Sequence, residues 1–289
     1  MKAYFQDSNF ITQFFLFWLV FFFCFAGGAV IGAMLTNGFS DEILALRINV
    51  LIWSSAAFIV PSFLVAYLLS EKAFQFLRLD QKSNLKVYLL LVLLIFAAFP
   101  FINLLADLNG RITFPESLSG IETQLRAMEA RATMQAEKLL TVHSLGGLLF
   151  IVFLIAIIPA FGEELFFRAG LQRIIANAQG KTAAIWITAF IFSAFHFRFF
   201  GFLPILLLGA FFGYLFVWGR NIWLPIVGHF ANNFFIVLYF FLYKNSIISN
   251  NFKTLGTGDT WWLGVISGIV FVSGIFLIKK MTLRAEPTP

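Results

Sequence analysis

Three ionisable side chains interrupt an otherwise apolar stretch of the chain, IVFLIAIIPAFGEELFFRAGL, within six residues: Glu163, Glu164 and Arg168. On insertion scales an ionisable residue at the centre of a membrane helix costs roughly 2.5 to 3.5 kcal/mol, and such residues usually serve a function. Two later apolar segments carry one histidine each, His196 and His229, and Asn233 follows one helical turn after the second. Carboxylate and imidazole groups can activate water, and an amide can stabilise an oxyanion. These residue types predict a hydrolytic site within a membrane.

The two adjacent glutamates are expected to differ in role. On a helix, Glu164 and Arg168 are four residues apart with the acid nearer the N-terminus, which favours an ion pair. Glu163 points about 100° away around the helix axis. A carboxylate without a partner in a low-dielectric medium takes up a proton more readily, so Glu163 is the candidate general base. In the alternative interpretation, all three charges form one buried cluster that only fixes helix packing.

The spacing of the histidines predicts which helices must meet. The polar stretch 177–181 is typical of the turn of a helical hairpin, and it lies midway between Glu163 and His196. These two side chains are therefore expected at similar depth on neighbouring antiparallel helices. His229 lies about seven residues into its span, against about 13 for His196, an offset of roughly 10 Å. A single membrane histidine can also serve only as a hydrogen-bonding contact between helices.

His229 and Asn233 lie four residues apart and share one helical face. An imidazole and an amide on one face can donate two hydrogen bonds to a single developing oxyanion. Asn232 is expected to point elsewhere and to serve as a packing contact. The third histidine, His143, lies at the boundary of a span and is predicted to be incidental.

The composition identifies the class of protein that carries these residues. The 289-residue chain is 60% hydrophobic and 12% charged, and its mean hydropathy is +0.89. These values are typical of a multi-span membrane protein. The predicted fold is an all-α polytopic bundle of about eight transmembrane helices, which forms a single integral membrane domain over residues 1–289 with its motif-bearing core at about 145–243. The apolar runs long enough to cross a bilayer are 11–35, 47–69, 87–105, 145–167, 183–199, 202–218, 222–243 and 261–278.

Several segments outside the motifs carry further expectations. The connection at about 106–144 contains GIETQLRAMEARATMQAEKLL, whose helical spacing predicts a surface helix that covers the rim of the bundle or, alternatively, recognises substrate. The glycines of GAFFG, Gly209 and Gly213, predict close helix approach. The first apolar run is expected to be a retained anchor rather than a signal peptide. The last residues, TLRAEPTP, are predicted to form a short disordered tail.

The basic residues predict how the chain is oriented. Of the 20 lysines and arginines, 12 fall on the side of the membrane that holds both termini and eight on the other side. Four of those eight lie in the long connection, where long loops weigh less in the positive-inside rule. Both termini are therefore predicted to be cytoplasmic. The net charge of +6 belongs to these loops, and no basic run accompanies it, so nucleic acid is not an expected partner. The single cysteine, Cys24, cannot form an internal disulfide.

Three strings in order resemble the motifs of a known family. EELFFR (163–168), FSAFH (192–196) and HFANN (229–233) match the EExxxR, FxxxH and HxxxN motifs of the CPBP intramembrane proteases. That family includes the CAAX prenyl endopeptidases and the Abi-type proteins linked to bacteriocin self-immunity. The resemblance covers about residues 153–233, and no departure from the three motifs is visible.

The resemblance implies an intramembrane endopeptidase, with Glu163 and His196 activating the attacking water and His229 and Asn233 stabilising the oxyanion. The ion pair of EELFFR would hold the site together. Family members are described both as metalloproteases and as glutamate-dependent enzymes. No cofactor is favoured here, because HExxH is missing. If Zn²⁺ is bound, its candidate ligands are Glu163, His196 and His229.

The implied substrate is a membrane-associated protein or peptide, with or without a lipid modification, and the implied location is a bacterial inner membrane. Two other functions compete with this one. The chain could be a non-catalytic scaffold or immunity protein that binds a toxin. It could also be a small transporter with the carboxylate as proton relay, which is disfavoured because no inverted repeat is evident.

Overall fold

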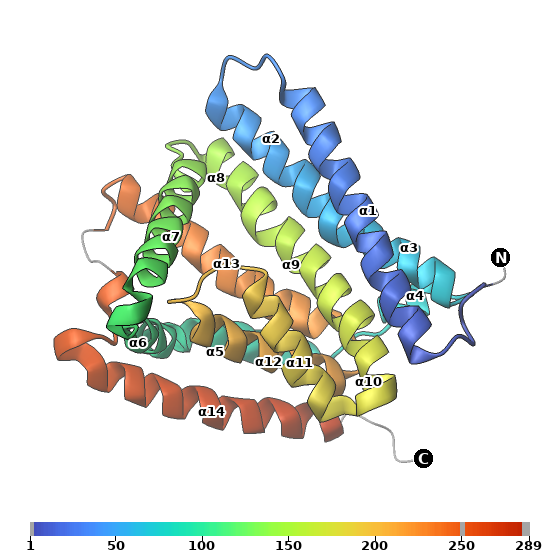
Figure 1. Cartoon of the computed structure of the whole chain (residues 1–289). Helices are drawn as coiled ribbons and strands as arrows, with labels where there is room; N and C mark the ends of the chain where they lie inside the picture. Colours follow the sequence, from blue (N-terminus) through green and yellow to red (C-terminus); the bar gives the residue numbers. More distant parts are fainter. Residues whose placement is uncertain (1–2, 249–251, 285–289) are drawn as a thin grey trace.

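The computed structural model describes residues 3–248 and 252–284, and this part of the chain is helical and contains no strand. Figure 1 shows its helices in chain order. In the N-terminal half they are α1 (Phe10–Thr36), α2 (Glu42–Ser54), η1 (Ser55–Ile59), α3 (Val60–Leu69), α4 (Ala73–Phe76), α5 (Leu85–Ala97), α6 (Phe99–Gly110), η2 (Glu116–Leu118) and α7 (Ser119–Leu140). In the C-terminal half they are α8 (Leu145–Ile151), η3 (Val152–Ile157), α9 (Ile158–Glu164), η4 (Leu165–Gln172), α10 (Arg173–Gln179), α11 (Lys181–Ala194), α12 (Phe202–Gly219), α13 (Trp223–Lys244), η5 (Phe252–Thr254), η6 (Gly258–Thr260) and α14 (Trp261–Arg284).

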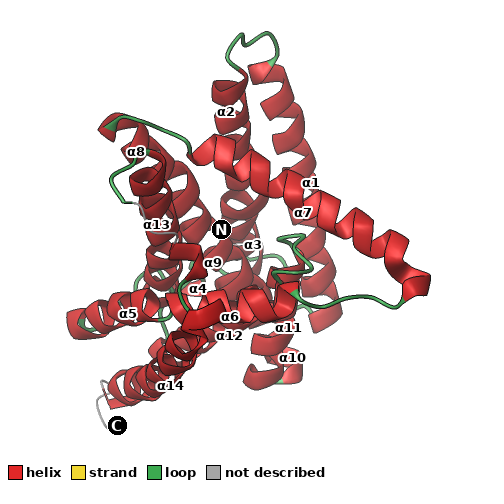
Figure 2. Cartoon of the chain, turned by 90° about the vertical axis from the view of Figure 1, so that its left-hand side faces the viewer, coloured by secondary structure: helices red, strands yellow, loops and turns green. Residues whose placement is uncertain are grey.

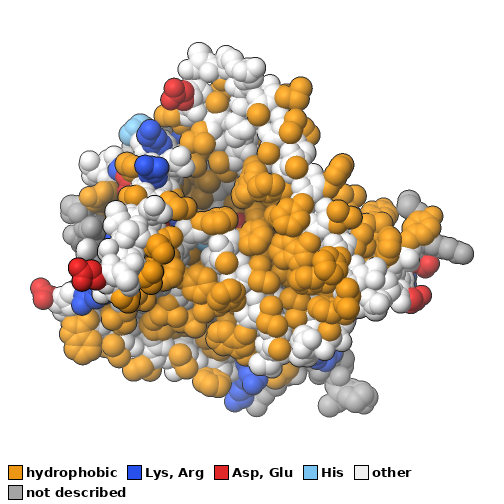
Figure 3. Space-filling view, in the orientation of Figure 1, with side chains coloured by type: hydrophobic (Ala, Val, Ile, Leu, Met, Phe, Trp, Pro, Cys, Tyr) orange, Lys and Arg blue, Asp and Glu red, His pale blue; other side chains and the backbone are white. Residues whose placement is uncertain are grey.

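The all-α polytopic bundle predicted from the sequence is confirmed, with a different division into spans. Six helical segments of the described chain are long and apolar enough to cross a membrane: Phe10–Thr36, Glu42–Leu69, Leu145–Gln179, Phe202–Gly219, Trp223–Lys244 and Gly258–Leu283. A seventh is possible if α5 and α6, bent by 44°, act as one span. The break falls at Ala98, two residues before Pro100, which has no amide N–H to donate to the carbonyl four residues earlier. Exposed hydrophobic side chains spread over the face shown in Figure 3, as a surface in contact with lipid requires.

The predicted span 183–199 is not a complete crossing. Helix α11 has 14 residues, which at 1.5 Å per residue reach about 21 Å of the roughly 30 Å hydrocarbon layer. His196 therefore lies two residues beyond the helix, in a turn, and not inside a span as the sequence predicted.

Three π-helical turns lie in or against the helices that carry Glu163, Glu164 and Arg168. Both η1 and η3 lead into a helix with proline at its second position, Pro61 in α3 and Pro159 in α9. Proline has no N–H to give to the carbonyl four residues earlier, so the helix widens or leaves that carbonyl to another donor. The third π turn, η4, begins directly after Glu164 and contains Arg168.

Close packing of α12 against α11 confirms the approach predicted from GAFFG. A Cβ atom added to Gly209 would lie 3.0 Å from a ring carbon of Phe192, and one added to Gly213 would lie 3.0 Å from Ile185. Both contacts are tighter than ordinary side-chain packing, so the two small residues let the helices approach. This packing places α12 against α11, whose last residues begin the FSAFH segment.

The connection between α6 and α8 contains the predicted surface helix, α7, which lies in front of the bundle in Figure 2. Its first turns are tied to the preceding loop, because Glu122 accepts hydrogen bonds from the Phe114 amide and from Arg126. Glu129 accepts a hydrogen bond from the amide of Phe200, in the loop that follows His196. The predicted C-terminal tail is wrong for its first three residues, because α14 continues to Arg284, and residues 285–289 lie outside the described part.

Candidate active site

The predicted ion pair between Glu164 and Arg168 is present and extends to a third residue. Glu164 Oε2 accepts a hydrogen bond from Arg168 Nε at 2.8 Å, and its Oε1 lies 2.9 Å from His229 Nδ1. The Glu164 and Arg168 side chains are fully buried, and His229 is 5% exposed. We call these three residues the buried ion cluster. The contact with His229 was not predicted, because it joins residues 65 positions apart.

Aromatic rings complete the surroundings of the buried ion cluster. The imidazole of His229 stacks on Phe212 with ring centroids 5.4 Å apart and meets the edge of Phe192 at 5.9 Å. The guanidinium carbon of Arg168 lies 4.9 Å from the centroid of the Phe192 ring. The rings leave His229 little freedom to rotate, so its Nδ1 edge stays toward Glu164.

The hydrogen bonds of the two histidines define which ring nitrogen is available. Nδ1 of His196 lies 2.8 Å from the backbone carbonyl oxygen of Phe192. A carbonyl only accepts, so this Nδ1 carries the hydrogen and Nε2 of the neutral ring has a lone pair. In His229 the carboxylate of Glu164 likewise accepts a hydrogen bond from Nδ1–H, so Nε2 is the ring nitrogen that remains available. Both rings can therefore act through Nε2.

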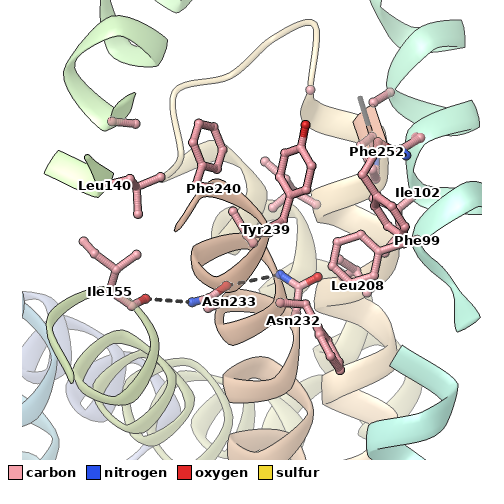
Figure 4. Close-up of a pocket in the computed structure, with 18 of the residues that line it drawn as sticks. Phe99, Ile102, Leu140, Ile155, Leu208, Asn232, Asn233, Tyr239, Phe240 and Phe252 are labelled. Carbon is pink, nitrogen blue, oxygen red and sulfur yellow. Dashed lines mark hydrogen bonds between the residues drawn. The ribbon is translucent and has the colours of Figure 1, made fainter. Parts of the chain in front are cut away.

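Asn233 is held by two hydrogen bonds, shown as dashed lines in Figure 4. Its Nδ2 donates to the carbonyl oxygen of Ile155 at 3.2 Å, and its Oδ1 accepts from Nδ2 of Asn232 at 3.1 Å. The Ile155 carbonyl lies four residues before Pro159, whose missing N–H deprives it of its α-helical donor. One N–H of the Asn233 amide remains for another acceptor.

Asn232 was expected to point elsewhere, and this expectation was wrong. Its amide orients that of Asn233 and lines the same cavity. The two residues are adjacent on α13, and the amide of Asn232 reaches that of its neighbour. The sequence did carry a signal, because HFANN contains two adjacent amides, and buried amides are normally hydrogen-bonded rather than packed only against apolar side chains.

A cavity of about 720 Å³ joins the second and third motifs. His196, His229, Asn232 and Asn233 all line it. Most of its other walls are apolar, and Figure 4 shows several of those side chains around Asn232 and Asn233. Helix α7 closes part of one wall with Thr133, Ala136, Glu137 and Leu140. Both histidines line one cavity, although the sequence predicted that they differ in depth, and His196 lies in the turn after α11.

Glu163 lies beside this arrangement and outside the buried ion cluster. Its side chain is half-buried, and its Oε2 atom is buried without a hydrogen-bond partner among the described residues. Glu163 is not one of the residues that line the cavity, whereas the carboxylate of the next residue contacts the cavity-lining His229. The alternative in which all three charges form one cluster is therefore incorrect for Glu163.

The candidate zinc ligands do not assemble in the described part of the chain. No group of three His, Cys, Asp or Glu side chains there lies close enough to hold a metal ion. A catalytic zinc site usually takes three protein ligands, so Glu163, His196 and His229 do not fit one in this arrangement. His143, the third histidine, pairs with Asn245 at 2.9 Å and does not line the cavity.

Comparison with known proteins agrees with the motifs. Residues 145–235 match the family model described as type II CAAX prenyl endopeptidase Rce1-like. This segment is Rce1-like. It runs from the start of α8 into α13 and contains all three motif strings, which confirms the resemblance to the CPBP family. The match, together with the apolar helices, supports an integral membrane protein with intramembrane protease function. No curated protein and no solved structure shows significant similarity to the chain.

Proposed function

We propose that the chain is an intramembrane endopeptidase that hydrolyses a peptide bond of a membrane-associated substrate. One observation carries the proposal: within the Rce1-like segment, two imidazoles and an amide line a single cavity, and the Glu164 carboxylate lies against one of those imidazoles. Acyl transfer to water needs a base, a positioned nucleophile and oxyanion donors. His196, His229 and Asn233 line the cavity and Glu163 lies beside it, and together they offer these groups.

Water activation is assigned to Glu163 and His196. The Glu163 carboxylate has a buried oxygen without a partner, and the neutral ring of His196 has its lone pair on Nε2. A water held between them gives its proton to one of these groups as its oxygen attacks the scissile carbonyl carbon. The C–O π electrons move to the oxygen, and the same proton later passes to the amine nitrogen as the C–N bond breaks.

Oxyanion stabilisation is assigned to Asn233 and His229. The Asn233 amide has one N–H left after its bond to the Ile155 carbonyl. His229 donates through Nε2 when its ring is protonated, and the adjacent Glu164 carboxylate compensates that positive charge, as the carboxylate of a serine-protease triad does for its histidine. Arg168 in turn pairs with Glu164 and holds its carboxyl group in place.

The shape of the cavity supports an apolar substrate segment. Its volume of about 720 Å³ and its mainly apolar walls suit a hydrophobic side chain, a lipid modification or a stretch of membrane peptide. We further propose that the chain forms one membrane domain, that both termini face the cytoplasm, and that the protein resides in a bacterial inner membrane.

The decisive experiment compares wild-type protein with Glu163→Gln on two substrates, a prenylated CAAX-type peptide and an unmodified transmembrane peptide. We expect Glu163→Gln to lower cleavage about 10²- to 10⁴-fold, the usual contribution of a general base. Products are identified by mass spectrometry, with and without a chelator. The matched control is Glu71→Gln, a carboxylate in the exposed loop before α4.

The outcomes separate the candidate functions. Wild-type rates in Glu163→Gln would contradict the assignment of the base. A chelator that abolishes cleavage would show that a metal takes part in a conformation other than the one described. Cleavage of only the prenylated peptide would define the substrate as lipidated. A toxin-protection assay that is insensitive to Glu163→Gln would instead favour a binding role.

A further inference from the structure

A second pocket, of about 270 Å³, lies away from the catalytic motifs, where α4, α10 and the start of α11 approach the end of α12. Figure 1 shows α4 and α10 at one end of the molecule. Among the described residues that line it, four are basic, two carry amides and none is acidic. The basic residues are Arg78, Arg173, Lys181 and Arg220, and the amides are Gln172 and Asn177.

Two arginines of this basic pocket are held in fixed positions. Arg78 donates a hydrogen bond to the Phe216 carbonyl at 3.5 Å, and its guanidinium lies over the Phe216 ring at 4.7 Å. Arg173 donates to the Phe76 carbonyl and lies over the Phe76 ring at 4.3 Å. Both side chains are half-buried. The guanidinium groups are therefore positioned before any ligand arrives.

The carbonyl contacts do not use up the donors of these arginines. A guanidinium has five N–H groups, and each of the two makes one hydrogen bond within the described residues. A purely structural explanation, in which the arginines neutralise the carbonyl ends of α12 and α4, accounts for one donor of each. It does not account for Lys181 or for the absence of a carboxylate among the lining residues.

The concentration of like charge has an electrostatic cost. Burial lowers the pKa of Arg78, and the nearby charges of Arg173 and Arg220 lower it further. A bound anion would remove that repulsion. Planar guanidinium groups match the oxygen geometry of phosphate, and basic pockets between transmembrane helices bind anionic headgroups.

We propose that this basic pocket binds a phosphate-bearing anion, whether the headgroup of an anionic phospholipid or free phosphate. Arg78 and Arg173 would supply charge-assisted hydrogen bonds to the phosphate oxygens, and Lys181 would add a third positive charge at the rim. The amides of Gln172 and Asn177 suit the hydroxyl groups of a glycerol headgroup. The pocket lies among residues that the positive-inside rule assigns to the cytoplasmic side, where anionic lipid is reached from the inner leaflet.

Ligand-dependent thermal unfolding of the purified full-length protein tests this site. The protein in neutral detergent is titrated with short-chain phosphatidylglycerol, with phosphatidylcholine of the same chain length, and with sodium phosphate at constant ionic strength. A ligand that binds the folded state raises the unfolding midpoint in a saturable way. A rise with phosphatidylglycerol alone identifies lipid as the source, and an equal rise with sodium phosphate identifies free phosphate.

Three variants assign the binding to the pocket. We expect Arg173→Gln to weaken apparent affinity about tenfold, the loss of one charge-assisted hydrogen bond. Lys181→Gln, at an exposed position that is safe for folding, should weaken it about threefold, the loss of one exposed charge. Lys82→Gln, an exposed lysine outside the pocket, should bind as wild type does. The proposal is wrong if neither phosphatidylglycerol nor phosphate gives saturable stabilisation, or if Lys181→Gln behaves like Lys82→Gln.

Discussion

His229 separates two regions of opposite character. On its Nδ1 side, Glu164 and Arg168 are fully buried and bonded to each other. On its other side lies the cavity, where His196 is exposed and Asn233 is half-buried. The two adjacent glutamates also differ, since Glu164 is bonded through both oxygens, whereas Glu163, which does not line the cavity, has a buried oxygen without a partner among the described residues.

The difference suggests how a membrane enzyme divides its polar groups. Buried charges are tolerated when they are paired, and removal of one partner is costly. Groups that act on a substrate must instead keep an unused donor or lone pair. Glu164 and Arg168 therefore hold His229 in place, while the groups that face the cavity remain available for chemistry. Substitutions on the two sides should accordingly affect different measurements.

The largest effect on stability is expected from Arg168→Leu, which leaves the Glu164 carboxylate buried with only His229 as partner. Removal of one member of a buried ion pair costs about 3 to 5 kcal/mol. Glu163→Gln, outside the buried ion cluster, should change the free energy of unfolding by less than about 0.5 kcal/mol. Denaturant unfolding in detergent measures both.

A double variant sharpens this test. Glu164→Gln combined with Arg168→Leu removes the uncompensated charge, so it should be more stable than Arg168→Leu alone. If the double variant is instead less stable than either single variant, the cost comes from lost packing, and the buried ion cluster is not held by its charges.

After Glu163→Gln, the largest effect on catalysis is expected from Asn233→Ala, and the loss of stability should be smaller. Loss of one oxyanion donor lowers turnover about 10²- to 10³-fold. Stability should fall by only about 1 to 3 kcal/mol, because the Ile155 carbonyl loses its partner. Turnover and unfolding are measured on the same preparation. A fall in substrate affinity with unchanged turnover would place Asn233 in substrate binding and not in the transition state.

A smaller catalytic effect is expected from Asn232→Leu. The Asn232 amide orients Asn233 through one hydrogen bond, and a neutral hydrogen bond contributes about 1 kcal/mol, so turnover should fall about fivefold to tenfold. The expected loss lies in turnover, with substrate affinity preserved. In the Asn233→Ala background the second substitution should have no further effect on turnover. Additive losses would show that Asn232 acts independently.

Contacts within one helix were predictable from the sequence, and contacts between helices were not. The Glu164–Arg168 ion pair follows from a spacing of four residues, which needs no tertiary information. The bond from Glu164 to His229 depends on how α13 packs against α9, and periodicity does not report that. The span count was close, but the place where α11 ends was not predicted, because the apolar run continues past Ala194 into the turn that holds His196.

The smallest effect concerns the outer wall of the cavity, where α7 is held by exposed contacts. The Phe114 amide and the Arg126 side chain both lower the pKa of Glu122, so the folded state favours its ionised form. The stabilisation is fully present above the usual pKa of a glutamate, about 4.3. It is lost as the pH falls through the lower pKa of the folded state. The protection of the Phe114 amide, measured by hydrogen exchange relative to the intrinsic rate at each pH, should therefore fall on acidification, while the segment around Arg168 keeps its protection. Glu122→Gln should remove this pH dependence. An equal loss of protection in both segments would show that α7 and the helix that carries Arg168 open together.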